Sequence, residues 1–155
     1  MDVPVLTIDG PSGAGKGTVS RAVARHLKWN YLDSGSIYRS LAIAALNEDV
    51  DLQDIERLTA IASTMKLEFQ CENELQVFLN GKEITPLLGT ETTGHAASVV
   101  AAHPEVRATL LQKQMDFQQL PGLVADGRDM GSVVFPDALY KVYLTASAEA
   151  VSYTH

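Results

Sequence analysis

Residues 10–18 read Gly10-Pro11-Ser12-Gly13-Ala14-Gly15-Lys16-Gly17-Thr18, and this glycine-rich segment indicates the fold class. The apolar run of residues 3–9 before it predicts a buried strand, and apolar residues at helical spacing after it predict a helix. A glycine-rich loop in this position turns backbone N–H groups toward an anion, and Lys16 adds a mobile positive charge. We therefore predict a phosphate-binding loop at residues 10–18, with an ordinary glycine-rich turn as the alternative.

The pattern on either side of this loop predicts an α/β fold with a parallel central sheet. A strand, a helix and a second strand in succession form a βαβ unit, whose crossover is right-handed. The expected strands are 3–9, 29–33, 123–125 and 140–144, and the expected helices beyond residue 33 are 36–46, 52–65, 96–102 and 104–119.

A different pattern separates the helices in the middle of the chain. Residues 66–71 and 74–79 alternate apolar with polar side chains, and Asn80-Gly81 favours a tight hairpin turn. We therefore expect a small antiparallel β insert over residues 66–88, within one domain that covers residues 1–155.

Composition restricts the partners. The formal net charge of -7 argues against broad binding to nucleic-acid backbones, which requires a surplus of Lys and Arg. The longest uninterrupted apolar stretch, residues 41–46, is far too short to span a membrane. The one cysteine, Cys71, cannot form an internal disulfide, which suits a reducing compartment. We expect a cytoplasmic protein that binds neither nucleic acid nor membrane.

Two polar segments follow predicted strands, at the sheet edge where ligands of such folds bind. They read Leu32-Asp33-Ser34-Gly35-Ser36-Ile37-Tyr38-Arg39 and Asp126-Gly127-Arg128-Asp129-Met130-Gly131. Ser34, the amides at the helix start and Arg39 together suit a monophosphate. The alternatives are a helix cap with a solvated arginine for the first segment and a turn with a local ion pair for the second.

These motifs resemble those of the bacterial cytidylate kinases. The Gly-Lys-Gly-Thr form of the loop, with Gly17 where Ser or Thr usually follows the lysine, is similar to that of the nucleoside-monophosphate kinases. Both polar segments resemble the family, as do Ala96-Ala97-Ser98 and Arg107. The resemblance covers about residues 3–149. It implies the three-layer P-loop NTPase fold of the nucleoside-monophosphate kinase type, with residues 66–88 as the acceptor-side insert.

The resemblance also implies an activity, namely transfer of the γ-phosphoryl group of ATP to CMP or dCMP by a monomer, with Mg²⁺. The loop at residues 10–18 would bind ATP, and Lys16 and Arg128 would act on the transferring group. The implied acceptor-binding residues are Ser34, Arg39, Ser98, Arg107, Arg128 and Asp129.

Chemistry independently supports the assignment of Asp129 to the base. A carboxylate such as that of Asp129 can accept from the cytosine N4 amino group and faces the O4 acceptor of uracil unfavourably. Thr18 and Asp126 are the candidate Mg²⁺ residues, acting through water, since an acidic residue at a strand end near such a loop often meets the waters of the metal. Lys16 is expected in the loop and outside the core, so that its loss costs little stability.

The sequence departs from the family pattern in two places. Residues 88–94 lack the arginine that the family has before Thr90, and residues 150–155 do not follow the family, whose arginine-rich lid is expected next. We therefore expect a fold that is incomplete at its C-terminus. Two alternative functions stay open: a nucleotide-binding fragment with little or no turnover, and a kinase for another small acceptor such as UMP or shikimate.

Overall fold

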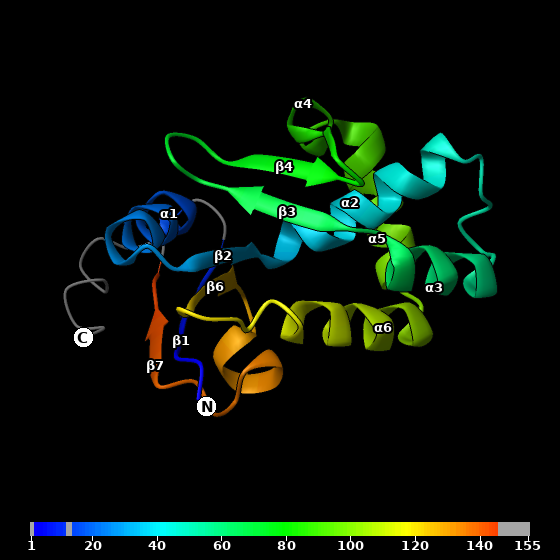
Figure 1. Ribbon diagram of the computed structural model, residues 1–155. Coiled ribbons are helices and arrows are strands. Elements are labelled where there is room, and N and C mark those ends of the chain that lie inside the picture. Colours follow the sequence, from blue (N-terminus) through cyan, green and yellow to red (C-terminus); the bar gives the residue numbers. More distant parts are fainter. Residues whose placement is uncertain (1, 12–13, 146–155) are drawn as a thin grey trace. The chain divides into compact units, whose positions relative to one another are not determined.

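The computed structural model describes residues 2–11 and 14–145, which fall into two compact units. Unit 1 comprises the described residues of Met1–Ser34, Cys71–Asn73 and Met115–His155. Unit 2 comprises Gly35–Gln70 and Glu74–Gln114. Figure 1 gives the course of the chain and the labels of its elements.

Unit 1 is built on a parallel sheet. Its strands are β1 (Val5–Asp9), β2 (Asn30–Asp33), β6 (Leu123–Gly127) and β7 (Tyr140–Tyr143). They lie in the order β2-β6-β1-β7, and every neighbouring pair is parallel (Figure 1). The predictions of a parallel sheet and of these strands are confirmed, within one or two residues at most ends.

The sheet is covered on both faces. Side chains alternate along a strand, and Asp126 of β6 meets the helix α1 (Lys16–Leu27), whereas Asp9 of β1 meets the short π-helix η1 (Met130–Val134). β6 is buried along its whole length, since strands flank both of its edges and α1 and η1 pack against it. An apolar, doubly covered strand of this kind is typical of parallel sheets.

Unit 2 holds most of the helices and a small antiparallel sheet. Its helices are α2 (Ser34–Asn47), α3 (Ile55–Thr64), α4 (Thr85–Leu88), α5 (Glu91–Ala101) and α6 (Pro104–Met115). Its strands are β3 (Leu67–Gln70), β4 (Gln76–Leu79) and β5 (Lys82–Glu83), in the order β3-β4-β5. Fully buried Leu41, Leu58, Val100 and Leu110 bring apolar side chains of four helices into its core.

The predicted hairpin turn is confirmed. Asn80 and Gly81 both have positive φ, 51° and 85°, as a two-residue turn between antiparallel strands requires. Asn80 Oδ1 also accepts from the Lys66 backbone N–H at 2.8 Å, which anchors the turn to the start of β3. The turn implies a strand after it, and β5 is that strand. The sequence set no bounds for β5 and did not indicate helix α4, because both are too short to show a periodicity.

Several helix ends differ from the predictions. The predicted 104–119 helix ends at Met115, beyond which the Gln118 side chain donates to the carbonyl of Val3 at 2.9 Å. The helix expected at 96–102 begins earlier, because Thr90 caps it by accepting from the Thr93 N–H. The helix expected from residue 52 begins only at Ile55, since Asp54 caps it.

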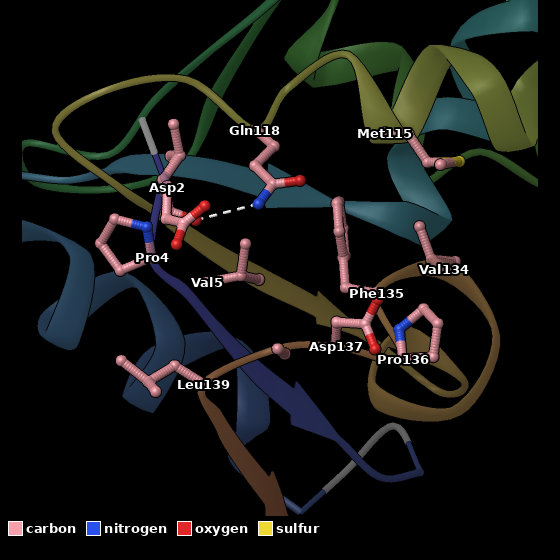
Figure 2. Close-up of a pocket in the computed structure, with 12 residues that line it drawn as sticks. Asp2, Pro4, Val5, Met115, Gln118, Val134, Phe135, Pro136, Asp137 and Leu139 are labelled. Carbon is pink, nitrogen blue, oxygen red and sulfur yellow. Dashed lines mark hydrogen bonds between the residues drawn. The ribbon is translucent and has the colours of Figure 1, made fainter.

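A hollow of about 750 Å³ opens in unit 1 at the amino-terminal end of β1 (Figure 2). Figure 2 shows Val5, Gln118, Phe135 and Leu139 among the side chains that line it. The predicted phosphate loop begins after Asp9, at the other end of the same strand. This hollow is therefore separate from the predicted nucleotide site.

Among the described residues, no helix has both the length and the apolar character needed to cross a bilayer.

We expect Leu123→Ala to lower the free energy of unfolding by about 2–5 kcal/mol, because it leaves a cavity in the central strand of the sheet. Leu123 is 0% exposed, whereas Leu139 of the same unit is 66% exposed. Leu139→Ala is the matched control and should change stability by less than about 0.5 kcal/mol. Urea denaturation followed by circular dichroism measures both values. Equal losses in the two variants would contradict the assignment of β6 to the core.

Candidate active site

The glycine-rich loop that was predicted to bind phosphate lies between a strand and a helix, β1 and α1, as expected. Two of its predicted nucleotide-binding residues, Ser12 and Gly13, lie outside the described residues. The others lie between the end of β1 and the first turn of α1: Gly10, Pro11, Ala14, Gly15, Lys16, Gly17 and Thr18. Gly15 has a φ of 75°, and its carbonyl accepts from the Val19 N–H at 3.1 Å. The left-handed backbone at Gly15 thus starts the helix.

Gly10 fixes where the loop leaves the sheet. Its φ is 149°, and a Cβ there would lie 2.2 Å from the carbonyl oxygen of Leu144. Its N–H donates to the carbonyl of Gly127 at 3.2 Å, and the Leu144 N–H donates to that of Asp9 at 2.8 Å. The loop therefore begins in a space bounded by the chains that continue from β6 and β7, and only glycine fits there.

Lys16 meets Asp126 at the carboxyl-terminal edge of the sheet. The lysine Nζ donates to Asp126 Oδ1 in an ion pair. The Lys16 side chain is 15% exposed and that of Asp126 is 3% exposed, so the pair is largely shielded from water. This pairing favours a larger loss of stability on removal of Lys16 than the sequence led us to expect, because a buried carboxylate depends on this lysine for its counter-charge.

Tyr31 of β2 completes this cluster, and sequence reasoning missed it. Its hydroxyl donates to Asp126 Oδ2 at 2.9 Å. Burial raises the pKa of the Tyr31 phenol far above its ordinary value, and the negative charges of Asp126 and Asp33 raise it further. The hydroxyl is therefore a permanent donor at any physiological pH.

Gly17 leaves room for a second cation. A Cβ at Gly17 would lie 2.9 Å from Arg21 Nη1 and 3.8 Å from Asp126 Oδ2. The space that a side chain would fill is thus bordered by the Arg21 guanidinium, one turn along α1. A larger residue at position 17 would therefore require the Arg21 guanidinium to move.

The predicted Mg²⁺ residues offer oxygen atoms but no enclosed metal site. Thr18 lies exposed on the first turn of α1, and both oxygens of Asp126 already have a protein partner. Among residues 2–11 and 14–145, no three His, Cys, Asp or Glu side chains gather as a metal cluster. These donors fit an ion that is coordinated mainly by phosphate oxygens of a ligand and by water. Mg²⁺ usually binds to proteins in this way.

The turn after β6 carries two of the residues that were predicted to bind the acceptor, Arg128 and Asp129. Arg128 and Asp129 are exposed at the strand end, and the Asp129 side chain makes no capping hydrogen bond to η1. A Cβ at Gly127 would lie 3.1 Å from the Cβ of Ser34, so Ser34 packs directly beside this turn. The structure thus brings the predicted residue Ser34 to the segment that carries Arg128 and Asp129.

Asp9 holds this turn in place, a role that the sequence did not indicate. Its carboxylate accepts from the backbone N–H groups of Met130 and Gly131 at 2.8 and 2.9 Å. The sequence shows only an acidic residue at the end of a strand, followed by glycine. It cannot show these hydrogen bonds, because the partners of Asp9 lie more than a hundred residues away.

In unit 2 the structure brings Arg39 and Ser98 to one turn of α5. Arg39 Nη1 donates to the carbonyl of Leu88 at 2.6 Å and lies 3.4 Å from where a Cβ of Gly94 would be. Ser98 Oγ donates to the carbonyl of Gly94 at 3.1 Å. The segment 88–94, which departs from the family pattern, thus contacts Arg39 at both of its ends.

Arg107 lies exposed on α6, the helix after α5. The predicted acceptor residues are therefore divided between the units, with Ser34, Arg128 and Asp129 in unit 1 and Arg39, Ser98 and Arg107 in unit 2.

Comparison with known proteins identifies the family. The cytidylate kinase family model matches residues 6–152. The chain is 56% identical over 147 residues to the cytidylate kinase of Methylococcus capsulatus, a match that covers 95% of this chain and 66% of the relative. It is 54% identical over 149 residues to those of Shewanella sp. MR-4 and Shewanella oneidensis, covering 94% of this chain and 65% of each relative.

The chain thus spans slightly less than two thirds of the length of these curated relatives. The match includes the phosphate loop and both polar segments, whose arrangement within each unit is described above. On this evidence the chain belongs to the cytidylate kinase family.

Proposed function

We propose that this chain transfers the γ-phosphoryl group of ATP to CMP or dCMP in the cytoplasm. The observation that carries the proposal is the placement of Lys16 against Asp126, where the phosphate loop enters α1 beside the end of β6. A lysine charge at a helix N-terminus, next to glycines, is suited to phosphates. The family name of the relatives, cytidylate kinase, supports the choice of acceptor.

On the donor side, the amides at the start of α1 and the Lys16 ammonium would hold the phosphates of ATP. The Lys16 ammonium would leave the carboxylate of Asp126 and bind a phosphate oxygen of ATP instead. Its positive charge would then move only a short distance within the site. Thr18 and Asp126 would hold Mg²⁺ through its waters. When bound with ATP, Mg²⁺ neutralises charge on the β- and γ-phosphates.

On the acceptor side, Arg39 and Arg128 would hold phosphates, and Arg128 would also act on the transferring group. Ser98, Arg107 and Asp129 would read the base, with Ser34 beside the acceptor phosphate. Asp129 has an exposed carboxylate that makes no capping hydrogen bond, so it can accept from the cytosine amino group. Catalysis then consists of positioning and charge stabilisation, and it requires no covalent step on the protein.

A coupled assay with CMP, dCMP, UMP and AMP as acceptors tests the proposal. Transfer should be fastest with CMP or dCMP. Faster transfer to UMP or AMP would contradict the assignment of the base-reading residues. ATP binding without transfer to any acceptor would instead support a nucleotide-binding protein with little or no turnover.

We expect Lys16→Ala to abolish transfer and to weaken ATP binding, because the charge that faces the phosphates is lost. It also leaves Asp126 buried without its cation, so the free energy of unfolding should fall by about 1–3 kcal/mol. Calorimetry with ATP and urea denaturation measure the two effects. Lys82→Ala, which removes an exposed lysine of β5, is the control and should change neither quantity. Unchanged ATP affinity in Lys16→Ala would contradict the assignment.

We expect Asp129→Asn to narrow the difference in binding free energy between CMP and UMP by about 1–3 kcal/mol, the usual contribution of one base contact. The amide can donate to O4 of uracil, which the carboxylate repels. Asp137→Asn changes another exposed aspartate of unit 1 and should leave the difference unaltered. An equal loss of affinity for both nucleotides in Asp129→Asn would mean that the base is read elsewhere.

We expect Gly94→Val to weaken CMP binding by about 1.5–3 kcal/mol, the range for a hydrogen bond to a charged group. The larger side chain would displace the Arg39 guanidinium, which lies 3.4 Å from the position of the first added carbon. Gly94→Ala is the matched control and should affect CMP affinity much less, because its methyl group needs only a small adjustment. If the two substitutions weaken CMP binding equally, the placement of Arg39 is not the cause.

A further inference from the structure

Tyr31 contacts the phosphate-binding lysine indirectly, through one carboxylate. Its hydroxyl donates to Asp126 Oδ2 at 2.9 Å, while Lys16 donates to Oδ1 of the same group. Tyr31 is 3% exposed and Asp126 is 2% exposed. A single buried carboxylate therefore joins a tyrosine of β2 to the lysine of the loop.

The sheet sets this geometry. In the register of β2 and β6, Tyr31 lies opposite Val124, two residues before Asp126. Side chains two residues apart on a strand share a face, so Tyr31 and Asp126 point to the same side of the sheet, where α1 begins. Because the tyrosine is on a buried strand, its hydroxyl approaches Asp126 from a fixed direction.

The hydroxyl determines how Asp126 can hold Lys16. A carboxylate whose two oxygens were both available could bind the ammonium more tightly than one whose second oxygen is already occupied. The Tyr31 hydrogen bond occupies Oδ2 and spreads its negative charge, which leaves Oδ1 to the lysine. Packing alone would not require this, since a phenylalanine ring would fill the same space.

We propose that Tyr31 is a positioning residue for Lys16: acting through Asp126, it limits the strength of the resting ion pair, so that the lysine can move to a phosphate of ATP while the carboxylate stays in place. This inference rests on the proposed function, because it takes the phosphates of ATP as the second partner of the lysine.

The electrostatic surroundings agree with this role. The Tyr31 hydroxyl is a neutral donor to Asp126, so it adds no negative charge of its own to the cluster. Asp33 adds a negative charge near the phenol and Arg21 adds a positive one. When Lys16 leaves, Asp126 keeps the hydrogen bond from Tyr31 and is not left without a partner.

The test is a double-mutant cycle on ATP affinity, measured by calorimetry on the full chain without acceptor. Tyr31→Phe alone should weaken ATP binding about tenfold, the effect expected when a partner that orients a site residue is lost. In an Asp126→Asn background the same substitution should have no further effect, because the carboxylate through which Tyr31 acts is gone. Tyr140→Phe, which alters a tyrosine of β7 that is 58% exposed, is the matched control.

Equal losses of ATP affinity in both backgrounds would mean that Tyr31 is only structural, and no loss in either would also overturn the proposal. Circular dichroism of each variant establishes that it is folded.

A second measurement needs no nucleotide. The side-chain NMR signal of Lys16, assigned by its disappearance in Lys16→Ala, should shift in Tyr31→Phe and stay in place in Tyr140→Phe. An unmoved Lys16 signal in Tyr31→Phe would overturn the role of Tyr31 even in an active kinase. Failure of the unsubstituted chain to bind ATP would instead contradict the proposed function on which the role rests.

Discussion

The ion pair between Lys16 and Asp126 is the constraint on which the rest of unit 1 depends. A buried carboxylate is stable only with a counter-charge or hydrogen bonds, so the fold must deliver a cation to one point at the sheet edge. β1 and β6 lie side by side, which places the loop after β1 next to the last residues of β6. Gly10 and Gly15 then turn the chain so that α1 starts with Lys16 at that point.

The same pair links stability to function. In the proposed reaction, the charge that stabilises Asp126 in the absence of nucleotide is the charge that would hold a phosphate of ATP. Asp9 performs a related task nearby, since its carboxylate fixes the turn that carries Arg128 and Asp129. Two aspartates on neighbouring strands thus hold residues of the proposed site: Asp126 pairs with the Lys16 side chain, and Asp9 accepts from the backbone amides of Met130 and Gly131.

Sequence predicted the elements that repeat a simple pattern. The buried strands are short apolar runs, the loop has a recognisable glycine spacing, and Asn80-Gly81 has few conformations other than a tight turn. Helix ends were less predictable, because caps such as Thr90 and Asp54 decide them locally. The hydrogen bond between Tyr31 and Asp126 was not predictable, because it depends on which strands are neighbours, and these residues are 95 positions apart.

The most direct test of this account is a crystal structure of the chain with an ATP analogue, Mg²⁺ and CMP. In that complex we expect Lys16 Nζ to have left Asp126 for a phosphate oxygen, while Asp126 keeps its hydrogen bond from Tyr31. We also expect the cytosine amino group to face Asp129. A complex in which Lys16 still pairs with Asp126 while the phosphates lie elsewhere would contradict this account.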